Sequence, residues 1–148
     1  MKPATLDRAG IAARIPHAGA MCLLDHLLAW DEAHIVCRTR SHRDPGNPLR
    51  SAGGLAAPCA IEYAAQAMAL HGTLGAAPGT PPKPGFLASV RAVRLHVPWL
   101  DRVEGELQVR AERLAGDAGQ ALYAFSLHSA DGTPLVDGRA TVILEALP

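Results

Sequence analysis

Two polar side chains interrupt an apolar, alanine-rich stretch near the middle of the chain. Glu62 and Gln66 stand four residues apart between Cys59 and Leu70, a spacing that places both on one face of a helix. An unpaired buried carboxylate costs on the order of several kcal/mol, so Glu62 must be paired, protonated or directed into a polar cleft. We therefore expect Glu62 to do acid–base chemistry, with Gln66 orienting its carboxyl group or a water. The alternative is a structural role, in which Glu62 pairs with an arginine or caps a neighbouring group.

The segment that carries this pair predicts a long helix over residues 57–73. Pro58 suits the first turn of a helix, and Gly72 suits its end. Apolar residues surround the predicted helix on nearly every side, so we expect it to be buried. The backbone N–H groups at its start, close to Gly53 and Gly54, could polarise a substrate carbonyl.

Strand patterns lie on both sides of the predicted helix. They cover residues 21–30, 33–40, 86–97, 104–114, 121–129 and 134–144. A short helix is expected over residues 5–14, a long loop over 41–54 and a proline-rich linker over 76–85. A helix that is apolar all round needs a sheet to cover it. We therefore expect an α+β fold, a curved antiparallel sheet wrapped around one central helix, in a single domain over residues 1–148.

The composition narrows the possible partners and compartments. Fourteen basic and fourteen acidic residues give a formal net charge of zero, which favours neither nucleic acid nor an anionic membrane as a partner. The three cysteines have no Cys-x-x-Cys spacing, and the N-terminus has no apolar signal core. No apolar run reaches the roughly 18 residues of a membrane span. We expect a reduced, cytoplasmic protein, and the scattered histidines predict no metal site.

Four short segments stand in a fixed order along the chain. They are Ile15-Pro16-His17, Cys-Leu-Leu-Asp-His-Leu-Leu at 22–28, His-Arg-Asp-Pro-Gly-Asn-Pro at 42–48 and Ile-Glu-Tyr-Ala-Ala-Gln at 61–66. In this order they resemble the Pro-His opening, first strand, histidine loop and glutamate helix of the 3-hydroxyacyl-acyl carrier protein dehydratases of fatty acid synthesis. Asn-Pro-Leu-Arg at 47–50 and residues 61–69 are most similar to the dehydratase-like proteins of aryl polyene clusters.

This resemblance implies a hotdog fold and a dehydration reaction. His42 would be the base, Glu62 the acid, and Gly53, Gly54 and Gln66 would contact the substrate. The substrate would be a 3-hydroxyacyl thioester on the phosphopantetheine of an acyl carrier protein, with no bound cofactor. In the family the histidine and the acid come from different subunits, so a homodimer, or a heterodimer with a second hotdog dehydratase, is expected. The chain departs from the family at His42, which stands one residue further from Gly46 than the family's histidine does.

Two other functions remain open at the level of sequence. The chain could be a non-catalytic hotdog subunit that supports an active partner, or a hotdog thioesterase in which the helix carboxylate activates water. For His42 the alternative is a solvated loop histidine.

Other conspicuous residues favour structural roles. His17 is expected to be packed beside Pro16, Cys59 to be a core residue, and Tyr63 to pack the core or a dimer contact. Arg91 and Arg94 could meet the phosphate of a pantetheine arm, although exposed strand arginines commonly do nothing specific.

Overall fold

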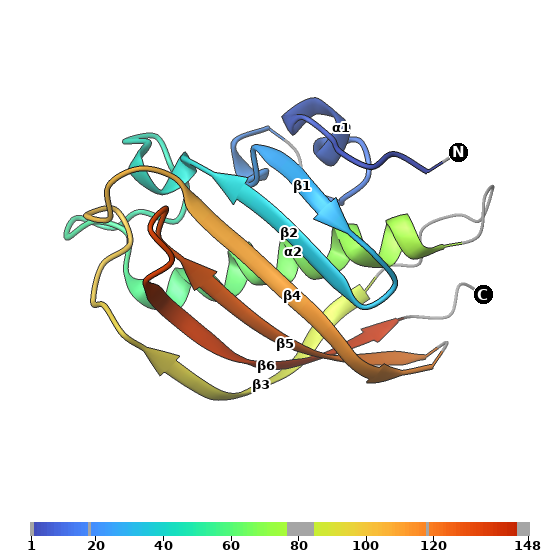
Figure 1. Ribbon diagram of the computed structural model, residues 1–148. Helices are drawn as coiled ribbons and strands as arrows, with labels where there is room; N and C mark the ends of the chain where they lie inside the picture. Colours follow the sequence, from blue (N-terminus) through green and yellow to red (C-terminus); the bar gives the residue numbers. More distant parts are fainter. Residues whose placement is uncertain (1, 18, 77–84, 118, 145–148) are drawn as a thin grey trace.

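One antiparallel sheet and one long helix make up most of the chain (Figure 1). The structure is a computed structural model that describes residues 2–17, 19–76, 85–117 and 119–144. The strand order is β1-β2-β4-β5-β6-β3, and every neighbouring pair is antiparallel. The strands are β1 (His26–Trp30), β2 (His34–Thr39), β3 (Gly85–Leu95), β4 (Leu107–Gly116), β5 (Gln120–His128) and β6 (Pro134–Leu144). The helix α2 (Ala60–Gly75) lies across one face of this sheet. The expected α+β architecture is confirmed.

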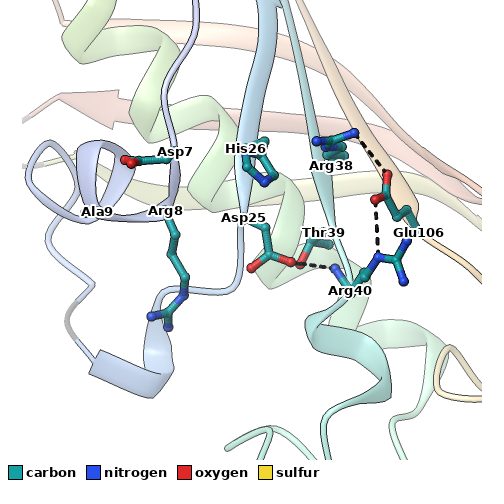
Figure 2. Close-up of a pocket in the computed structure, with 9 residues that line it drawn as sticks. All are labelled: Asp7, Arg8, Ala9, Asp25, His26, Arg38, Thr39, Arg40 and Glu106. Atoms are coloured by element: carbon teal, nitrogen blue, oxygen red, sulfur yellow. Dashed lines mark hydrogen bonds and ion pairs between the residues drawn. The ribbon is translucent and has the colours of Figure 1, made fainter.

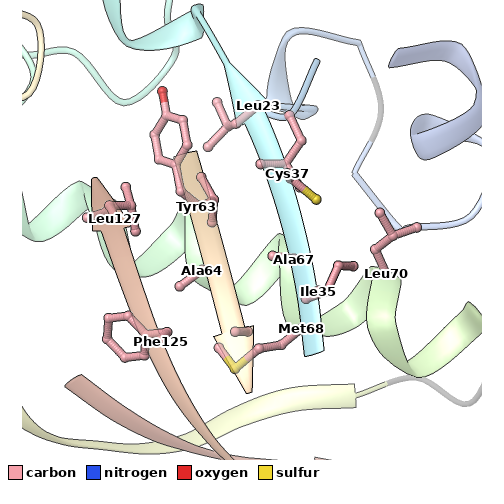
Figure 3. Packing of buried hydrophobic residues seen from close by; sticks show 14 of the residues in the cluster. Leu23, Ile35, Cys37, Tyr63, Ala64, Ala67, Met68, Leu70, Phe125 and Leu127 are labelled. Carbon is pink, nitrogen blue, oxygen red and sulfur yellow. The ribbon is translucent and has the colours of Figure 1, made fainter. Parts of the chain in front are cut away.

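The core forms between α2 and the central strands (Figure 3). Along β5 every second residue from Ala121 to Leu127 is buried, the alternation of a strand with one face on a core. Phe125 from β5 and Ile35 from β2 belong to the same apolar cluster as Ala64 and Met68 of α2. Small alanine side chains let the helix approach the sheet closely while the larger residues fill the gaps between them. This packing fixes which side of α2 faces the sheet.

A stripe of α2 stays partly exposed in the single chain. Ile61, Ala65 and Ala69 follow one another at helical spacing and are only half-buried, whereas Ala64 and Ala67 are fully buried. The prediction that the helix is buried on nearly every side is therefore wrong for one chain alone. The sheet covers one side of the helix and leaves this apolar stripe without a complete cover.

The first predicted strand is shorter than expected. Only His26–Trp30 forms β1, and a 3-10 turn, η1, occupies Gly19–Met21. Between them the backbone of Leu23 bonds side chains instead of a neighbouring strand: its N–H donates to Gln66, and its carbonyl accepts from Thr39 and Ser41. Tertiary hydrogen bonds thus replace the ladder that the apolar sequence predicted.

The remaining boundaries move by a few residues. The leading helix α1 is limited to Arg8–Ala12, with Asp7 as its N-cap. A 3-10 turn, η3 (Ala57–Cys59), precedes α2, and another, η2 (Ser41–Arg43), begins the predicted loop. Most of the predicted linker, residues 77–84, lies outside the described residues. No helix in the described part of the chain has the length and apolar character needed to cross a membrane.

Candidate active site

A hydrogen-bond network fastens the turn that carries His42 to the central helix. The hydroxyl of Tyr63, on α2, lies 2.8 Å from Ser41 Oγ and accepts from Asn47 Nδ2 at 3.0 Å. Ser41 Oγ donates to the carbonyl of Leu23 at 2.7 Å, so it accepts the hydrogen of Tyr63. Burial raises the pKa of Tyr63 to about 12, which keeps this hydroxyl a neutral donor. The network holds η2 against the first turns of α2.

His42 is fully buried, which excludes the solvated loop histidine. Its Nε2 lies 2.9 Å from the carbonyl oxygen of Val103. A carbonyl can only accept, so Nε2 carries the hydrogen and donates it. Nδ1 is buried and has no partner among the described residues. Burial, the largest influence, lowers the pKa of His42 below the ordinary 6.5. His42 is therefore neutral at pH 7, with its lone pair on Nδ1.

Glu62 lies in the first turn of α2 and is held by two nitrogen donors. His17 Nε2 is 3.0 Å from Oε1 of Glu62, and Gln66 Nε2 donates to the same oxygen at 3.3 Å. The contact with Gln66 is the one predicted from their spacing. No arginine pairs with Glu62 within the described ranges. With 34% of its side chain exposed, Glu62 is open to solvent and does not sit in the apolar surroundings expected from the sequence.

Gln66 is fully buried and uses its amide to join two segments. Its Oε1 accepts from the N–H of Leu23 at 2.9 Å, and its Nε2 donates to the carbonyl of Met21 at 2.7 Å. Both amide ends are thereby satisfied, which a buried polar group requires. Gln66 fixes the segment after His17 to the helix that carries Glu62.

Gly53 and Gly54 precede η3 and α2, and the N–H groups of Gly54 and Leu55 are used within the fold. Gly54 N–H donates to the carbonyl of Ser51 at 3.1 Å, and the next N–H, of Leu55, donates to Asp101 at 2.9 Å. Packing explains both glycines. A Cβ at Gly53 would lie 2.7 Å from Trp99, and one at Gly54, where φ is +120°, would lie 2.7 Å from the Asp101 carboxylate.

The N–H groups closest to α2 are also used within the fold. Ala57 donates to the carbonyl of Pro98 at 3.0 Å, and Cys59 donates to the carbonyl of Ala56 at 2.9 Å. The N–H groups of Ala57 and Cys59, in the turn before the helix, are therefore both bonded to backbone carbonyls. A carbonyl-polarising role for this helix start has no free donor in these two groups.

The two candidate catalytic residues are held separately in one chain. No hydrogen bond or ion pair joins His42 and Glu62 within the described chain. They are nevertheless linked through α2, because Glu62 is followed directly by Tyr63, which anchors the His42 turn. The sequence did not reveal His17, Ser41 or Val103 as parts of this arrangement, since their contacts join segments far apart in the chain.

A known family matches nearly the whole chain. The family model described as ApeP-like, ApeP dehydratase, matches residues 9–146. The chain belongs to the ApeP-like dehydratase family. None of the curated proteins matches it.

Solved structures share the fold of this ApeP-like chain. The dehydratase heterocomplex ApeI:P from Xenorhabdus doucetiae is 25% identical, with a TM-score of 0.82, over 92% of this chain and 91% of that one. A thioesterase from Haemophilus influenzae is 14% identical, with a TM-score of 0.67, over 96% of this chain and 92% of its own. A thioesterase variant from Pseudomonas aeruginosa is 15% identical, also with a TM-score of 0.67, over 96% of both chains. The expected hotdog fold is confirmed, and the two thioesterases bear on the fold alone.

A second polar region of the ApeP-like chain lies between α1 and the edge of the sheet (Figure 2). Arg38 and Arg40 both reach Glu106, at 3.6 Å and 3.2 Å, and the Asp25 carboxylate accepts the backbone N–H of Arg40 at 2.7 Å. Two arginines thus share the one carboxylate of Glu106, while Asp25 accepts a backbone N–H. Arg94, a predicted phosphate contact, pairs with Asp137 at 2.9 Å.

Proposed function

We propose that this chain is a subunit of a 3-hydroxyacyl thioester dehydratase that forms the trans-2-enoyl thioester on an acyl carrier protein, in fatty acid-like or aryl polyene synthesis. The observation that carries this proposal is the buried, neutral His42, whose one available lone pair is at Nδ1. The ApeP-like family membership supports the reaction class. The heterocomplex with which the chain shares its fold is itself a dehydratase.

The two residues divide the chemistry of water loss between them. Nδ1 of His42 takes the proton from the carbon beside the thioester carbonyl, and those electrons form the new double bond. The bond from the next carbon to the hydroxyl breaks, and the carboxyl group of Glu62 donates its proton to the departing oxygen. Water and the enoyl thioester leave, with His42 protonated and Glu62 ionised. One proton moved from His42 to Glu62 restores the starting state.

A second hotdog subunit completes the proposed site. The partly exposed stripe of α2, with Ile61, Ala65 and Ala69, is apolar and lies beside Glu62. β3 is an edge of the sheet and exposes Phe86 and Leu95. Unpaired edges and apolar stripes of this kind are where subunits associate. We propose that a partner covers them, that the acyl chain lies between the two subunits, and that one substrate is reached by His42 of one subunit and by Glu62, or the matching acid of a second hotdog dehydratase, of the other.

Substitution of the two residues in the assembled complex tests the proposal. Glu62→Gln and His42→Asn should each lower turnover of a 3-hydroxyacyl thioester by on the order of a hundredfold or more, because each removes a general acid or base. Glu32→Gln, in the exposed turn after β1, is the matched control and should leave turnover unchanged. The product is identified by mass spectrometry, and circular dichroism checks that each variant is folded.

Each competing function has its own outcome in this experiment. Release of free acid instead of enoyl thioester would establish a thioesterase. Full turnover in both variants would show that the chain is a non-catalytic subunit supporting an active partner. Either result contradicts the dehydratase proposal for this subunit.

A further inference from the structure

The two nitrogen donors around Glu62 contact the same carboxyl oxygen. His17 Nε2 lies 3.0 Å from Oε1, and Gln66 Nε2 lies 3.3 Å from it. The other oxygen, Oε2, has no hydrogen-bond partner in the part of the chain that the structure describes. The carboxyl group is thus held asymmetrically, by one oxygen only.

This asymmetry determines where a proton can sit on the carboxyl group. A carboxylic acid has one O–H group, and an oxygen that accepts two N–H bonds is the carbonyl-type oxygen. The proton of a neutral Glu62 therefore belongs on Oε2. His17 fits this arrangement, because its Nδ1 is buried without a partner among the described residues. A neutral imidazole with its hydrogen on Nε2 donates to Glu62 and buries only an acceptor at Nδ1.

One of the two donors, Gln66, is itself held in place by hydrogen bonds. Gln66 is oriented by the carbonyl of Met21 and the N–H of Leu23, which lie in the segment that follows His17. The amide nitrogen of Gln66 has two hydrogens, so one reaches Met21 and the other reaches Glu62. Met21 and Leu23 therefore orient Gln66 directly. His17, the other donor, stands four residues before Met21 in the sequence.

We propose that His17 is a positioning residue for Glu62. With Gln66 it holds Oε1, so that Oε2 alone carries the transferable proton and faces the substrate. This inference rests on the proposed function, in which Glu62 is the acid that protonates the departing hydroxyl. His17 itself transfers no proton to the substrate.

Another histidine in the chain offers a matched comparison. His34 Nδ1 lies 3.1 Å from Asp31, and its Nε2 lies 3.7 Å from Glu112, but more than half of each of these side chains is exposed. The His17–Glu62 pair is better buried, with 24% and 34% of the side chains exposed. Only the His17–Glu62 pair includes a carboxyl group that the proposed reaction uses. His34→Ala is therefore the control for loss of a histidine–carboxylate pair.

The test measures turnover of the assembled complex for His17→Ala, His17→Gln, Glu62→Gln and the double variant His17→Ala/Glu62→Gln, with His34→Ala as the control. Loss of one directing hydrogen bond should lower kcat of His17→Ala by about tenfold, with KM changed little. His17→Gln keeps an N–H donor and should recover most of that loss. The double variant should be no slower than Glu62→Gln, because His17 acts only through Glu62. His34→Ala should match the unmodified complex.

The possible failures are distinguishable. Full activity of Glu62→Gln would overturn the proposed function itself. If Glu62→Gln is impaired while His17→Ala is not, the role of His17 is overturned and the proposed function stands. A double variant about tenfold slower than Glu62→Gln would assign His17 a structural role independent of Glu62. If His17→Ala does not fold, His17→Gln decides: a folded variant that turns over as slowly as Glu62→Gln contradicts positioning by hydrogen bond.

Discussion

At the scale of single residues, the hydroxyl of Tyr63 connects the two halves of the candidate site. It lies within hydrogen-bond distance of Ser41 and Asn47, which flank His42 in the turn after β2. In Figure 3 this hydroxyl points away from the apolar cluster while the ring packs within it. The residue before it is Glu62. A side chain expected to pack the core or a dimer contact therefore also positions the proposed base.

The chain contains two buried tyrosines, which allow a paired prediction. Tyr63→Phe leaves Ser41 and Asn47 without their shared partner, and Tyr123→Phe leaves His71 Nδ1 without its donor at 2.7 Å. Each should lower the free energy of unfolding by about 1–3 kcal/mol, as loss of a buried hydrogen-bond partner does. Only Tyr63→Phe should also lower turnover, by about tenfold, because only Tyr63 holds the His42 turn.

Urea denaturation and the turnover of the assembled complex measure the two effects separately. Equal turnover of the Tyr63→Phe and Tyr123→Phe variants would contradict the positioning role of Tyr63. A loss of stability in only one variant would show that the two hydroxyls are not equivalent in the fold.

At the scale of elements, α2 is anchored near both ends by buried polar contacts. Near its start, Gln66 bonds the segment before β1. Towards its end, His71 Nε2 donates to the carbonyl of Asp31 at 2.8 Å and its Nδ1 accepts from Tyr123. These contacts join the helix to the β1–β2 hairpin and to β5. They set the rotation of a helix whose apolar residues alone would permit several orientations.

Stability should decrease on mild acidification because of the buried histidines. Burial lowers the pKa of His71, and likewise of His42, below the ordinary 6.5. Unfolding exposes both rings, so the unfolded chain binds more protons between that value and the lower folded pKa. Their contribution to the unfolding free energy is complete above pH 6.5 and decreases as the pH falls below it. His71→Gln should make this decrease shallower, while His34→Gln, in an exposed position, should not.

Chemical denaturation at a series of pH values from about 8 to about 5 checks this prediction. Control measurements with His34→Gln separate the buried rings from the exposed ones. If the unfolding free energy of His71→Gln falls with pH as steeply as that of the unmodified protein, His71 does not titrate differently in the folded and unfolded states.

At the scale of the whole molecule, the sheet ends in a strand with an exposed apolar surface. β3 pairs with β6 on one side only, and it exposes 53% of Phe86 and 49% of Leu95. The half-buried stripe of α2 is a second incomplete surface. Natural proteins rarely leave a long apolar edge strand uncovered. The form of the single chain therefore favours an assembly, as in the heterocomplex that shares its fold.

Charged substitutions on this edge should prevent assembly without unfolding the subunit. Phe86→Lys and Leu95→Lys replace exposed apolar side chains on β3. Each should therefore change the free energy of unfolding by no more than about 0.5 kcal/mol. Burying the new charge against a partner should weaken association by at least tenfold. Leu114→Lys, at an exposed leucine on β4, is the control. Native mass spectrometry and size-exclusion chromatography with the partner subunit report the result, and unchanged association of all three variants would exclude β3 from the interface.

The sequence alone determined the features that depend on short-range periodicity. The four-residue spacing placed Glu62 beside Gln66, because helix geometry makes such residues neighbours wherever the helix lies. Alternating apolar residues and turn signals determined β4, β5 and β6 within a few residues. The α+β class followed, since a helix and strands of this kind can bury their apolar faces only against one another.

Only the tertiary structure decided which distant groups meet. His17 reaches Glu62, Val103 reaches His42 and Asp101 takes the N–H of Leu55, and each contact joins segments far apart in the chain. Local propensity carries no information about such meetings, because they depend on how the loops and the N-terminal segment pack around α2. Only the structure likewise shows that Trp99 and Asp101 leave no room for a Cβ at the two glycines before the helix. The pattern along the chain singled out Glu62 as a candidate acid, and the packing of the chain showed what holds its side chain.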